Sequence, residues 1–285
     1  MEAPAMKAIC LHRLSYARIK RLTNWLVECL MEWLSNLILP PTCTYCQNSS
    51  VGHHNLCRKC KEDIVFCDNN TCTYCSLTLP PHPEEYTKFS KKFGKNVIVC
   101  DFCYDGKYKF DALICPTIYG EKISSMASAL KFEGQTNNAK FFALEINKQI
   151  ALKNLCKIDI IACVPISRRR LFFRGYNQAS LIAKFIYLEQ KKINPNVIFA
   201  PNLLQKIKHT KPQSKLSRIE RIKNIKNCFS LNKAILPKIN KDLNILLVDD
   251  IATTLATITE ACKTLKTHFK TSKILACAFS RVDIM

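Results

Sequence analysis

The stretch Asn244-Ile-Leu-Leu-Val-Asp-Asp-Ile-Ala-Thr-Thr-Leu-Ala-Thr257 joins a short apolar run to two aspartates and a turn rich in hydroxyl groups. Short continuous apolar runs are typical of buried parallel strands, and open α/β sheets bind ligands just beyond the carboxyl ends of such strands. Asp249 and Asp250 follow the run directly. We therefore expect both carboxylates at the ligand-binding edge of a parallel sheet.

The residues after the aspartates predict a helix that begins at the same edge. Between Thr253 and Lys266 the apolar residues recur at helical spacing, at Leu255, Ile258, Ala261, Cys262 and Leu265. Free N–H groups at a helix N-terminus favour a phosphate, and the hydroxyl groups of Thr253, Thr254 and Thr257 are further donors. The stretch therefore indicates a site for a phosphorylated sugar. The alternative is an acidic pair that is only solvated at the end of a strand.

The same stretch resembles the phosphoribosyl pyrophosphate (PRPP) motif of type I phosphoribosyltransferases. That motif has an apolar run, Asp-Asp, a short turn, Thr-Thr-Gly-Ala-Thr and a helix. This chain matches it except at the glycine position, where Leu255 stands. A glycine has no Cβ atom, so backbone N–H groups can approach a phosphate closely. We therefore expect Leu255 to crowd the 5′-phosphate and to reduce activity.

The N-terminal third of the chain is marked by regularly spaced cysteines. The seventeen cysteines include four C-x2-C pairs, which are Cys43/Cys46, Cys57/Cys60, Cys72/Cys75 and Cys100/Cys103. Two such turns complete a four-thiolate shell around Zn2+, which stabilises a segment too small for a core of its own. We predict two zinc sites, the first from the first two pairs and the second from the last two. A crossed pairing, disulfides and an iron–sulfur cluster remain open alternatives.

The predicted zinc is structural, because a closed four-thiolate shell leaves no open position for a substrate. The cysteines outside the pairs include Cys163, Cys262 and Cys277, which lie in apolar runs and are expected to be small core residues. An odd cysteine count also argues against a disulfide-rich secreted protein. We therefore predict a cytoplasmic location.

The length and the net charge of the chain limit the number of domains and indicate the class of ligand. A chain of 285 residues with 48% hydrophobic residues can hold one sizeable α/β domain and a small module. The net charge of +21 would attract nucleic acid or another polyanion. The alternative is coding bias, because much of the charge is lysine in a chain also rich in asparagine and isoleucine.

The first 38 residues form a separate segment that we expect to be dispensable. Residues 1–21 are basic apart from Glu2, and residues 22–39 are apolar but interrupted by Glu28 and Glu32. This pattern predicts an amphipathic helix at a membrane surface or a partner, and neither a transmembrane span nor a secretory signal. Met31 is a plausible alternative start.

The remaining chain divides into a double zinc-ribbon module over residues 39–104 and an α/β domain over residues 105–285. Alternating apolar strands and helices in the second part favour a Rossmann-like parallel sheet flanked by helices. The strands are expected at 112–118, 158–164 and 197–200, the helices at 122–132 and 138–152, and a basic turn at 167–178 that leads into a helix through residue 188.

Further segments occur in the order and spacing of one family. They are Leu39-Pro-Pro-Thr-Cys43, Leu130-Lys-Phe132, Val164-Pro165 with Arg174-Gly-Tyr-Asn-Gln-Ala179, and Thr210-Lys-Pro-Gln213 with Arg221. The chain resembles the ComF family, which joins an N-terminal cysteine module to a type I phosphoribosyltransferase domain. That family includes competence proteins for DNA uptake and gluconate-utilisation relatives.

The resemblance implies a role for each segment. Asp249 and Asp250 would accept the ribose hydroxyls and help to position Mg2+, and Thr253, Thr254 and Thr257 would cradle the 5′-phosphate. The pyrophosphate would face Ser167, Arg168 and Arg174, and a mobile lid would contain Lys208 and Gln213, with Arg221 just beyond it. The alternatives are a solvated charge run at Arg168, Arg169 and Arg170 and a merely flexible basic linker in place of the lid.

Two functions follow, and the first is favoured. It is a Mg2+-dependent phosphoribosyltransferase that moves phosphoribosyl from PRPP to a nitrogen nucleophile, with an expected link to DNA uptake. The alternative is a catalytically impaired protein that senses PRPP or binds single-stranded DNA with the competence machinery.

Overall fold

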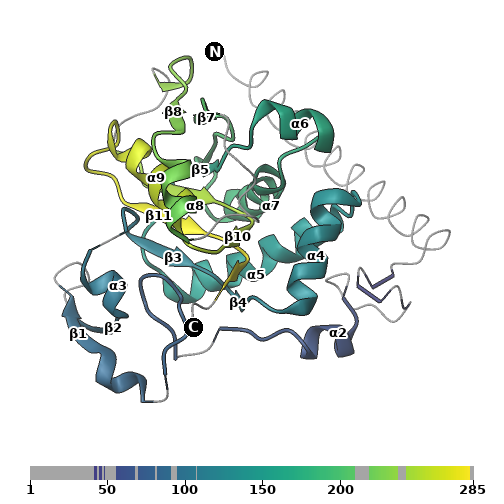
Figure 1. Ribbon diagram of the computed structural model, residues 1–285, viewed down its shortest axis with the longest axis horizontal. Helices are drawn as coiled ribbons and strands as arrows, with labels where there is room; N and C mark the ends of the chain where they lie inside the picture. The colour runs from purple at the N-terminus through teal and green to yellow at the C-terminus, as the bar shows by residue number, and fades with distance from the viewer. Residues whose placement is uncertain are drawn as a thin grey trace, which may run out of the picture.

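A parallel sheet of five strands forms the centre of the protein (Figure 1). The computed structural model describes residues 42–43, 45–46, 48, 56–67, 70–80, 82–90, 95–106, 108–208, 218–236 and 242–282. The strand order is β3-β11-β9-β5-β6, with β3 at Ala112–Ile114, β11 at Ile274–Cys277, β9 at Ile245–Val248, β5 at Ile160–Cys163 and β6 at Ile198–Phe199. The sheet confirms the predicted α/β class.

The central strands are apolar on both faces, as expected for a sheet covered by helices on each side. Every residue of β5, β9 and β11 is buried. The register places Val248 opposite both Cys163 and Cys277, and Cys277 opposite Ile114. The carboxyl ends of four neighbouring strands are therefore level, and the residues that follow them share one edge.

Three of these strands continue beyond a two-residue break into a second, smaller parallel sheet. Its order is β10-β12-β4, with β10 at Ile251–Ala252, β12 at Ser280–Arg281 and β4 at Thr117–Ile118. The breaks fall at residues 249–250, 278–279 and 115–116. Asp249 and Asp250 thus occupy the step between the two sheets. The backbone N–H of Asp249 donates to Cys277 O at 2.8 Å, and the N–H of Phe279 donates to Asp250 O at 3.0 Å.

The single strand predicted at 112–118 is wrong, because the segment divides between the two sheets. Pro116 lies at the break and has no N–H to donate to a neighbouring strand. Its carbonyl accepts the N–H of Cys67 at 2.8 Å, so the break also holds the cysteine module against the sheet.

Helices cover both faces of the sheet (Figure 1). On one face lie α5 and α7, with α4 packed on α5, and on the other lies α9, with α8 packed on it. Their bounds are Glu121–Phe132 for α4, Asn137–Lys153 for α5, Gln178–Ile193 for α7, Arg218–Ile225 for α8 and Ala256–Lys266 for α9. A hairpin of β7 and β8, at Leu204–Lys206 and Phe229–Leu231, packs beside α9.

The basic segment predicted as a turn is instead a short helix, α6, at Arg168–Arg174. The hydroxyl of Ser167 accepts the N–H of Arg170 at 3.4 Å and caps the first turn. Gly175 ends the helix with a φ of 75° and donates its N–H to Leu171 O. Glycine adopts the left-handed backbone conformation with little strain, so Gly175 can end the helix at this position.

The cysteine module contains short elements that pack against both faces of the sheet. These are α2 at Arg58–Glu62, a 3-10 helix at Pro83–Tyr86, the antiparallel pair β1 and β2 at Thr87–Ser90 and Lys95–Ile98, and α3 at Asp101–Tyr104. The first four-cysteine group belongs to the core beneath α4, α5 and α7. The second belongs to the core on the α9 face. Both groups therefore extend the core of the α/β domain.

Some predictions fall on residues that the structure does not describe. The N-terminal helix over residues 1–38 and most of the predicted lid, including Gln213, lie outside the described ranges. Within those ranges, the structure has no helix with the length and apolar character needed to span a bilayer.

Candidate functional site

Two groups of four cysteines form candidate metal centres. They are Cys43, Cys46, Cys57 and Cys60, called the first cluster here, and Cys72, Cys75, Cys100 and Cys103, called the second cluster. The four sulfur atoms of each cluster lie within 4.8 Å of one another. A tetrahedral shell with Zn–S bonds of about 2.3 Å has sulfur atoms about 3.8 Å apart. The Cys46 to Cys57 and Cys75 to Cys100 sulfur distances are both 3.7 Å, which fits such a shell.

This geometry decides between the alternatives left open by the sequence. The first pair joins the second and the third joins the fourth, so the crossed arrangement is wrong. The thiols are free rather than disulfide-bonded. Four sulfur atoms this close together leave room for one metal ion and not for a cluster of several irons. Each group therefore has the arrangement of a closed zinc site, which is structural rather than catalytic.

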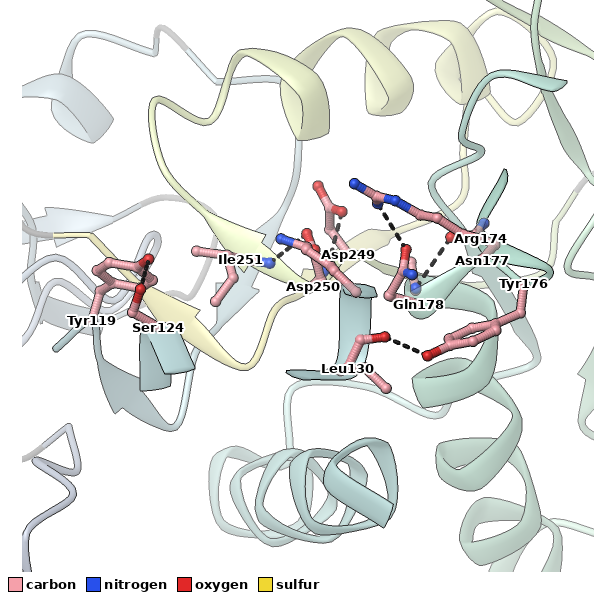
Figure 2. A network of polar contacts seen from close by, with 12 residues as sticks. Tyr119, Ser124, Leu130, Arg174, Tyr176, Asn177, Gln178, Asp249, Asp250 and Ile251 are labelled. Carbon is pink, nitrogen blue, oxygen red and sulfur yellow. Dashed lines mark hydrogen bonds and ion pairs between the residues drawn. The ribbon is translucent and has the colours of Figure 1, made fainter. Parts of the chain in front are cut away.

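The carboxylates of Asp249 and Asp250, called the acidic pair here, face a pocket at the step between the two sheets (Figure 2). Asp249 Oδ1 accepts the N–H of Asp250 at 2.9 Å, and Asp250 Oδ1 accepts the N–H of Ile251 at 2.8 Å. Asp250 Oδ2 lies 2.5 Å from Nζ of Lys131, which comes from α4. The pair is thus fixed by backbone donors and by one lysine.

The two carboxylates differ in their affinity for a proton. Burial raises the pKa of Asp249 well above its usual value, and the neighbouring charge of Asp250 raises it further. Burial also acts on Asp250, but the charge and hydrogen bond of Lys131 outweigh it and lower the pKa of this carboxyl. Asp250 is therefore the charged member of the pair, and Asp249 is the member that holds a proton more readily.

The pocket has a volume of about 910 Å3 and carries basic groups as well as the acidic pair. Arg170, Arg174 and Lys206, called the basic wall here, all line it. Burial lowers the pKa of both Arg174 and Lys206, and the charge of Arg170 lowers both further. Cations that have lost part of their hydration shell favour an anionic ligand. The pocket thus combines a site for an anion with a site for hydroxyl groups or a cation.

The segment Leu130-Lys131-Phe132 at the end of α4 contacts its surroundings through each residue, and Lys131 and Phe132 line the pocket. Leu130 accepts a hydrogen bond at its carbonyl from the Tyr176 hydroxyl, as Figure 2 shows. Lys131 pairs with Asp250. The guanidinium of Arg174 lies 5.0 Å from the ring centroid of Phe132. Three contacts therefore join α4 to the acidic pair and to the end of α6.

The residues after α6 complete this side of the pocket. Gln178 Oε1 accepts a hydrogen bond from Arg174 Nη1 at 3.2 Å. Asn177 donates from Nδ2 to Val164 O at 3.0 Å and accepts the N–H of Ala179, so it caps α7 and ties that helix to the end of β5. Figure 2 shows the contact between Arg174 and Gln178, with Asn177 beside them.

The turn before α9 is where the chain departs from the PRPP motif. Leu255 has a φ of 60° and a ψ of 2°, the left-handed conformation that glycine adopts without strain. Its side chain is only 2% exposed and packs in the core on the α9 face. The leucine therefore keeps the backbone course of a glycine turn and directs most of its side chain into the core.

A buried arginine lies beneath the same turn. Arg281 of β12 is 0% exposed and donates from Nη1 to Thr253 O at 2.6 Å. Its Nε and Nη2 atoms have no hydrogen-bond partner among the described residues. A buried cation here adds positive charge under the threonine turn and holds one of its carbonyls in place.

Comparisons with known proteins found one family model and several distant relatives. A family model described as the double zinc ribbon domain matches residues 34–104. Competence protein F of Haemophilus influenzae is 26% identical over 231 residues, which are 79% of this chain and 90% of that protein. This chain is a distant homologue of competence protein F. The DNA utilization protein YhgH of Escherichia coli K12 is 23% identical over 238 residues, which are 80% of this chain and 92% of the relative.

The homology confirms the resemblance to the ComF family, and the zinc ribbon match agrees with the two clusters. The structure brings several of the predicted site residues together in one pocket. They are Asp249, Asp250, Thr253, Thr257 and Arg174.

Other predicted residues lie elsewhere. Thr254, Ser167, Arg168 and Lys208 are not among the lining residues of the pocket. Ser167 instead caps α6, and Arg168 is exposed on that helix. Arg221 lies on α8.

Several lining residues with polar side chains had no predicted role, and four of them make the contacts or carry the charges described above. Lys131, Arg170, Lys206 and Gln178 lie on α4, α6, β7 and α7. The sequence offered a signal for two of them, because Lys131 and Gln178 fall within the segments that carry the family resemblance. Lys206 had none, since a lysine in a short strand is usually solvated.

Proposed function

We propose that the pocket binds PRPP together with Mg2+ and transfers its phosphoribosyl group to a nitrogen nucleophile. The observation that carries this proposal is the acidic pair at the step between the sheets, in one pocket with Arg170, Arg174 and Lys206. PRPP has the matching chemistry, since its ribose hydroxyls suit carboxylate acceptors and its phosphates suit cations. The donor is a cytoplasmic metabolite, so the predicted location is part of the proposal.

The reaction breaks the bond between C1 of the ribose and the pyrophosphate oxygen, and the electron pair leaves with the pyrophosphate. A nitrogen lone pair forms the new bond to C1, and the nitrogen then loses a proton. The basic wall would stabilise the departing charge, because preorganised cations cost no reorganisation as that charge develops. Asp249 and Asp250 would hold the 2′- and 3′-hydroxyls and so orient C1 toward the nucleophile.

Thr253 and Thr257 line the pocket at the start of α9, where Leu255 supplies no side-chain cap to the helix N-terminus. We assign the 5′-phosphate to this turn. The buried guanidinium of Arg281 supports the assignment, since its positive charge lies below the turn and is not neutralised by the hydrogen bonds described.

The described residues suit Mg2+ held through the ligand. Each aspartate uses its Oδ1 for a backbone N–H, and Oδ2 of Asp250 is paired with Lys131, so few carboxylate oxygens remain for direct coordination. Mg2+ keeps several waters and binds through few carboxylates and substrate phosphates. Asp249 and Asp250 would hold it through ribose oxygens or water. When bound, Mg2+ neutralises charge on the phosphate oxygens.

We further propose that residues 105–285 carry this chemistry and that residues 39–104 support it. The relatives are named for competence and for DNA utilization. We extend that link with DNA uptake or use to this chain. The acidic pair and the basic wall favour PRPP binding whether or not the transfer step is fast, so a PRPP-sensing protein is the second candidate.

Calorimetric titration of PRPP in the presence of Mg2+ tests the proposal. We expect the unchanged protein to bind and the Asp249→Asn/Asp250→Asn form to give no heat. A Leu255→Gly form, checked for folding by circular dichroism, tests whether the leucine limits PRPP binding. Binding by the glycine form alone would mean that the leucine has closed a phosphate site. If neither form binds, the phosphoribosyl proposal is wrong.

A further inference from the structure

Arg281 is a cation buried in the middle of the small sheet. It lies on β12, between β10 and β4, and is 0% exposed. Neighbouring strands hold its backbone from both sides, because the N–H of Tyr119 donates to Arg281 O at 2.8 Å and the N–H of Val282 donates to Ala252 O at 2.9 Å. The guanidinium therefore stays buried as long as the small sheet is intact.

The guanidinium of Arg281 forms no ion pair in the part of the chain that the structure describes. Its Nε and Nη2 atoms also have no hydrogen-bond partner there. Its charge acts on Tyr108 and Cys115, but burial raises the pKa of both to about 12. Both groups therefore keep their protons at neutral pH and supply no negative charge.

A buried cation without a partner destabilises a folded protein. Buried polar groups are almost always satisfied, so an exception calls for an explanation. A bound anion suits Arg281, because it would supply the missing negative charge whenever the ligand is present. The contacts of the guanidinium indicate where that anion would lie.

The guanidinium contacts the turn that opens α9. Its Nη1 atom donates to Thr253 O at 2.6 Å, and Thr253 lines the pocket. The first turn of α9 contains no acidic residue, and Leu255 before it supplies no side-chain cap. The N-terminus of a helix favours an anion through its N–H groups and its dipole. The buried cation and the helix therefore attract an anion to the same place.

This place is separate from the basic wall. Arg170 and Arg174 lie on α6, which follows β5, whereas the turn at Thr253 follows β10. The pocket therefore has two positively charged regions, one beside α6 and one at the turn. A ligand with two anionic groups suits them, and PRPP is such a ligand, since it carries a pyrophosphate on C1 and a phosphate on C5.

We propose that Arg281 is a positioning residue for a phosphate dianion at the turn before α9. Its charge attracts the phosphate from beneath, and its hydrogen bond holds the Thr253 carbonyl oxygen, which would otherwise repel the anion. The inference rests on the proposed function for the 5′-phosphate of the ligand, and it adds a cation that does not line the pocket. Arg281 lowers the stability of the free protein, and the bound phosphate offsets that loss.

Calorimetric titration of the full chain with ribose 5-phosphate, and separately with pyrophosphate and Mg2+, tests the two regions one at a time. Arg281→Met should bind ribose 5-phosphate about tenfold more weakly, because a cation close to the anion in a low-dielectric site is lost. Its affinity for pyrophosphate should stay within about twofold. Arg174→Gln should show the reverse pattern. Lys122→Met, which removes one positive charge outside the pocket, is the matched control and should change neither affinity.

The charge of the ligand separates an electrostatic role of Arg281 from a merely structural one. Ribose 5-sulfate has one negative charge where ribose 5-phosphate has about two at neutral pH. Arg281→Met should therefore weaken the binding of the sulfate less than that of the phosphate. Arg281→Lys keeps the charge and should retain most of the preference for phosphate. A structural role would lower both affinities by the same factor.

Thermal unfolding gives a second readout. Without ligand, Arg281→Met should have the same Tm as the unchanged protein or a higher one, because replacing a buried charge by an apolar side chain of similar size is often neutral or stabilising. The rise in Tm with saturating ribose 5-phosphate should be smaller in this form, since its affinity is lower.

Three results would overturn the role of Arg281. If the unchanged protein binds neither ligand, the proposed function fails and this inference falls with it. If the unchanged protein binds both and Arg281→Met has equal affinity for ribose 5-phosphate, only the inference fails. Faster zinc release from Arg281→Met with unchanged affinity for ribose 5-phosphate would show that the charge balances the thiolates of the second cluster instead.

Discussion

The acidic pair and the two cysteine clusters both gather groups that carry negative charge, but they differ in where the compensating cation comes from. At the acidic pair the chain supplies it, because Lys131 lies 2.5 Å from Asp250. In the second cluster, the described hydrogen bonds of the thiols run to one another and to backbone N–H groups. Protein atoms alone can therefore order the pocket, whereas we expect the cysteine module to depend on a metal ion.

Removal of the metal should give the largest effect. Structural zinc contributes about 10–16 kcal/mol of apparent binding free energy in small zinc domains, so its loss should unfold the module. We expect two zinc ions per chain in protein purified under reducing conditions, and loss of thermal stability with a strong chelator. Less than one zinc per chain would contradict the dependence of the module on metal.

Paired serine substitutions separate the two clusters. Cys72→Ser/Cys75→Ser should destabilise the α/β domain as well as the module, because both residues are 0% exposed in the core that contains the central strands. Cys43→Ser/Cys46→Ser should have a smaller effect on that domain, since Cys46 is exposed. Limited proteolysis of residues 105–285 measures the difference, and equal protection in both forms would contradict it.

Removal of the internal cation should have the next largest effect. Lys131→Met leaves Asp250 charged and partly buried without its partner, which should cost about 2–3 kcal/mol of unfolding free energy. Lys122→Met is the matched control on the same helix, because its partner Asp63 is 53% exposed, and its loss should cost ~0.5 kcal/mol or less. Urea denaturation measures both. Equal losses would mean that Lys131 is no more important than a surface lysine.

The two aspartates should respond to the same substitution with opposite signs. Asp250→Asn removes the ion pair with Lys131 and should destabilise the protein by about 1–2 kcal/mol at neutral pH. Asp249→Asn removes a carboxyl whose pKa is raised by burial and by Asp250, and should stabilise it by about 1 kcal/mol. Thermal unfolding at pH 7 measures both, and a shift of the same sign would contradict the assignment of charge.

The pH dependence of this difference follows from the direction of the pKa shift. Because the pKa of Asp249 is raised in the folded protein, this residue contributes stability at pH values below its unfolded pKa of about 3.9. That stability is lost as the pH rises through the folded pKa. The advantage of Asp249→Asn should therefore be small near pH 4 and grow toward pH 7. A constant advantage over this range would show that Asp249 does not titrate in it.

The smallest expected effect is the order of metal release. Cys46 is exposed, whereas Cys72, Cys75 and Cys100 are buried. A weak colorimetric chelator should therefore remove one zinc faster than the other, and Cys43→Ser/Cys46→Ser should abolish the fast phase. Release in one phase would mean that the two clusters exchange metal equally.

The sequence was most informative where one local pattern determines both structure and chemistry. The apolar run before Asp249 predicted the central strand and its polar end, and the C-x2-C spacing predicted both clusters. The caps of α6 were also visible, as Ser167 and Gly175, but the basic residues between them favoured a turn. If Ser167 and Gly175 are taken as the N-terminal and C-terminal caps, the sequence predicts that helix.

Contacts between distant segments were not predictable in this way. Lys131 is far from Asp250 in the chain, and only the packing of α4 beside the sheet edge brings them together. Arg281 gave no signal at all, because an arginine near the end of a chain is usually solvated. That Leu255 crowds the phosphate turn stays a prediction, because its side chain is almost wholly buried in the core but the residue also lines the pocket.

The middle position of β12 in the small sheet has a consequence for the order in which the protein can assemble during its synthesis. Strands β4 and β10 each pair with β12 and do not neighbour one another. A ribosome that has made residues 1–279 has therefore produced both outer strands, the acidic pair and the threonine turn, but not the strand that joins them. Arg281, which donates a hydrogen bond to the Thr253 carbonyl, is synthesised only with β12. The pocket is thus one of the last parts of the described chain to form, and nascent chains shorter than 281 residues should not hold its ligand.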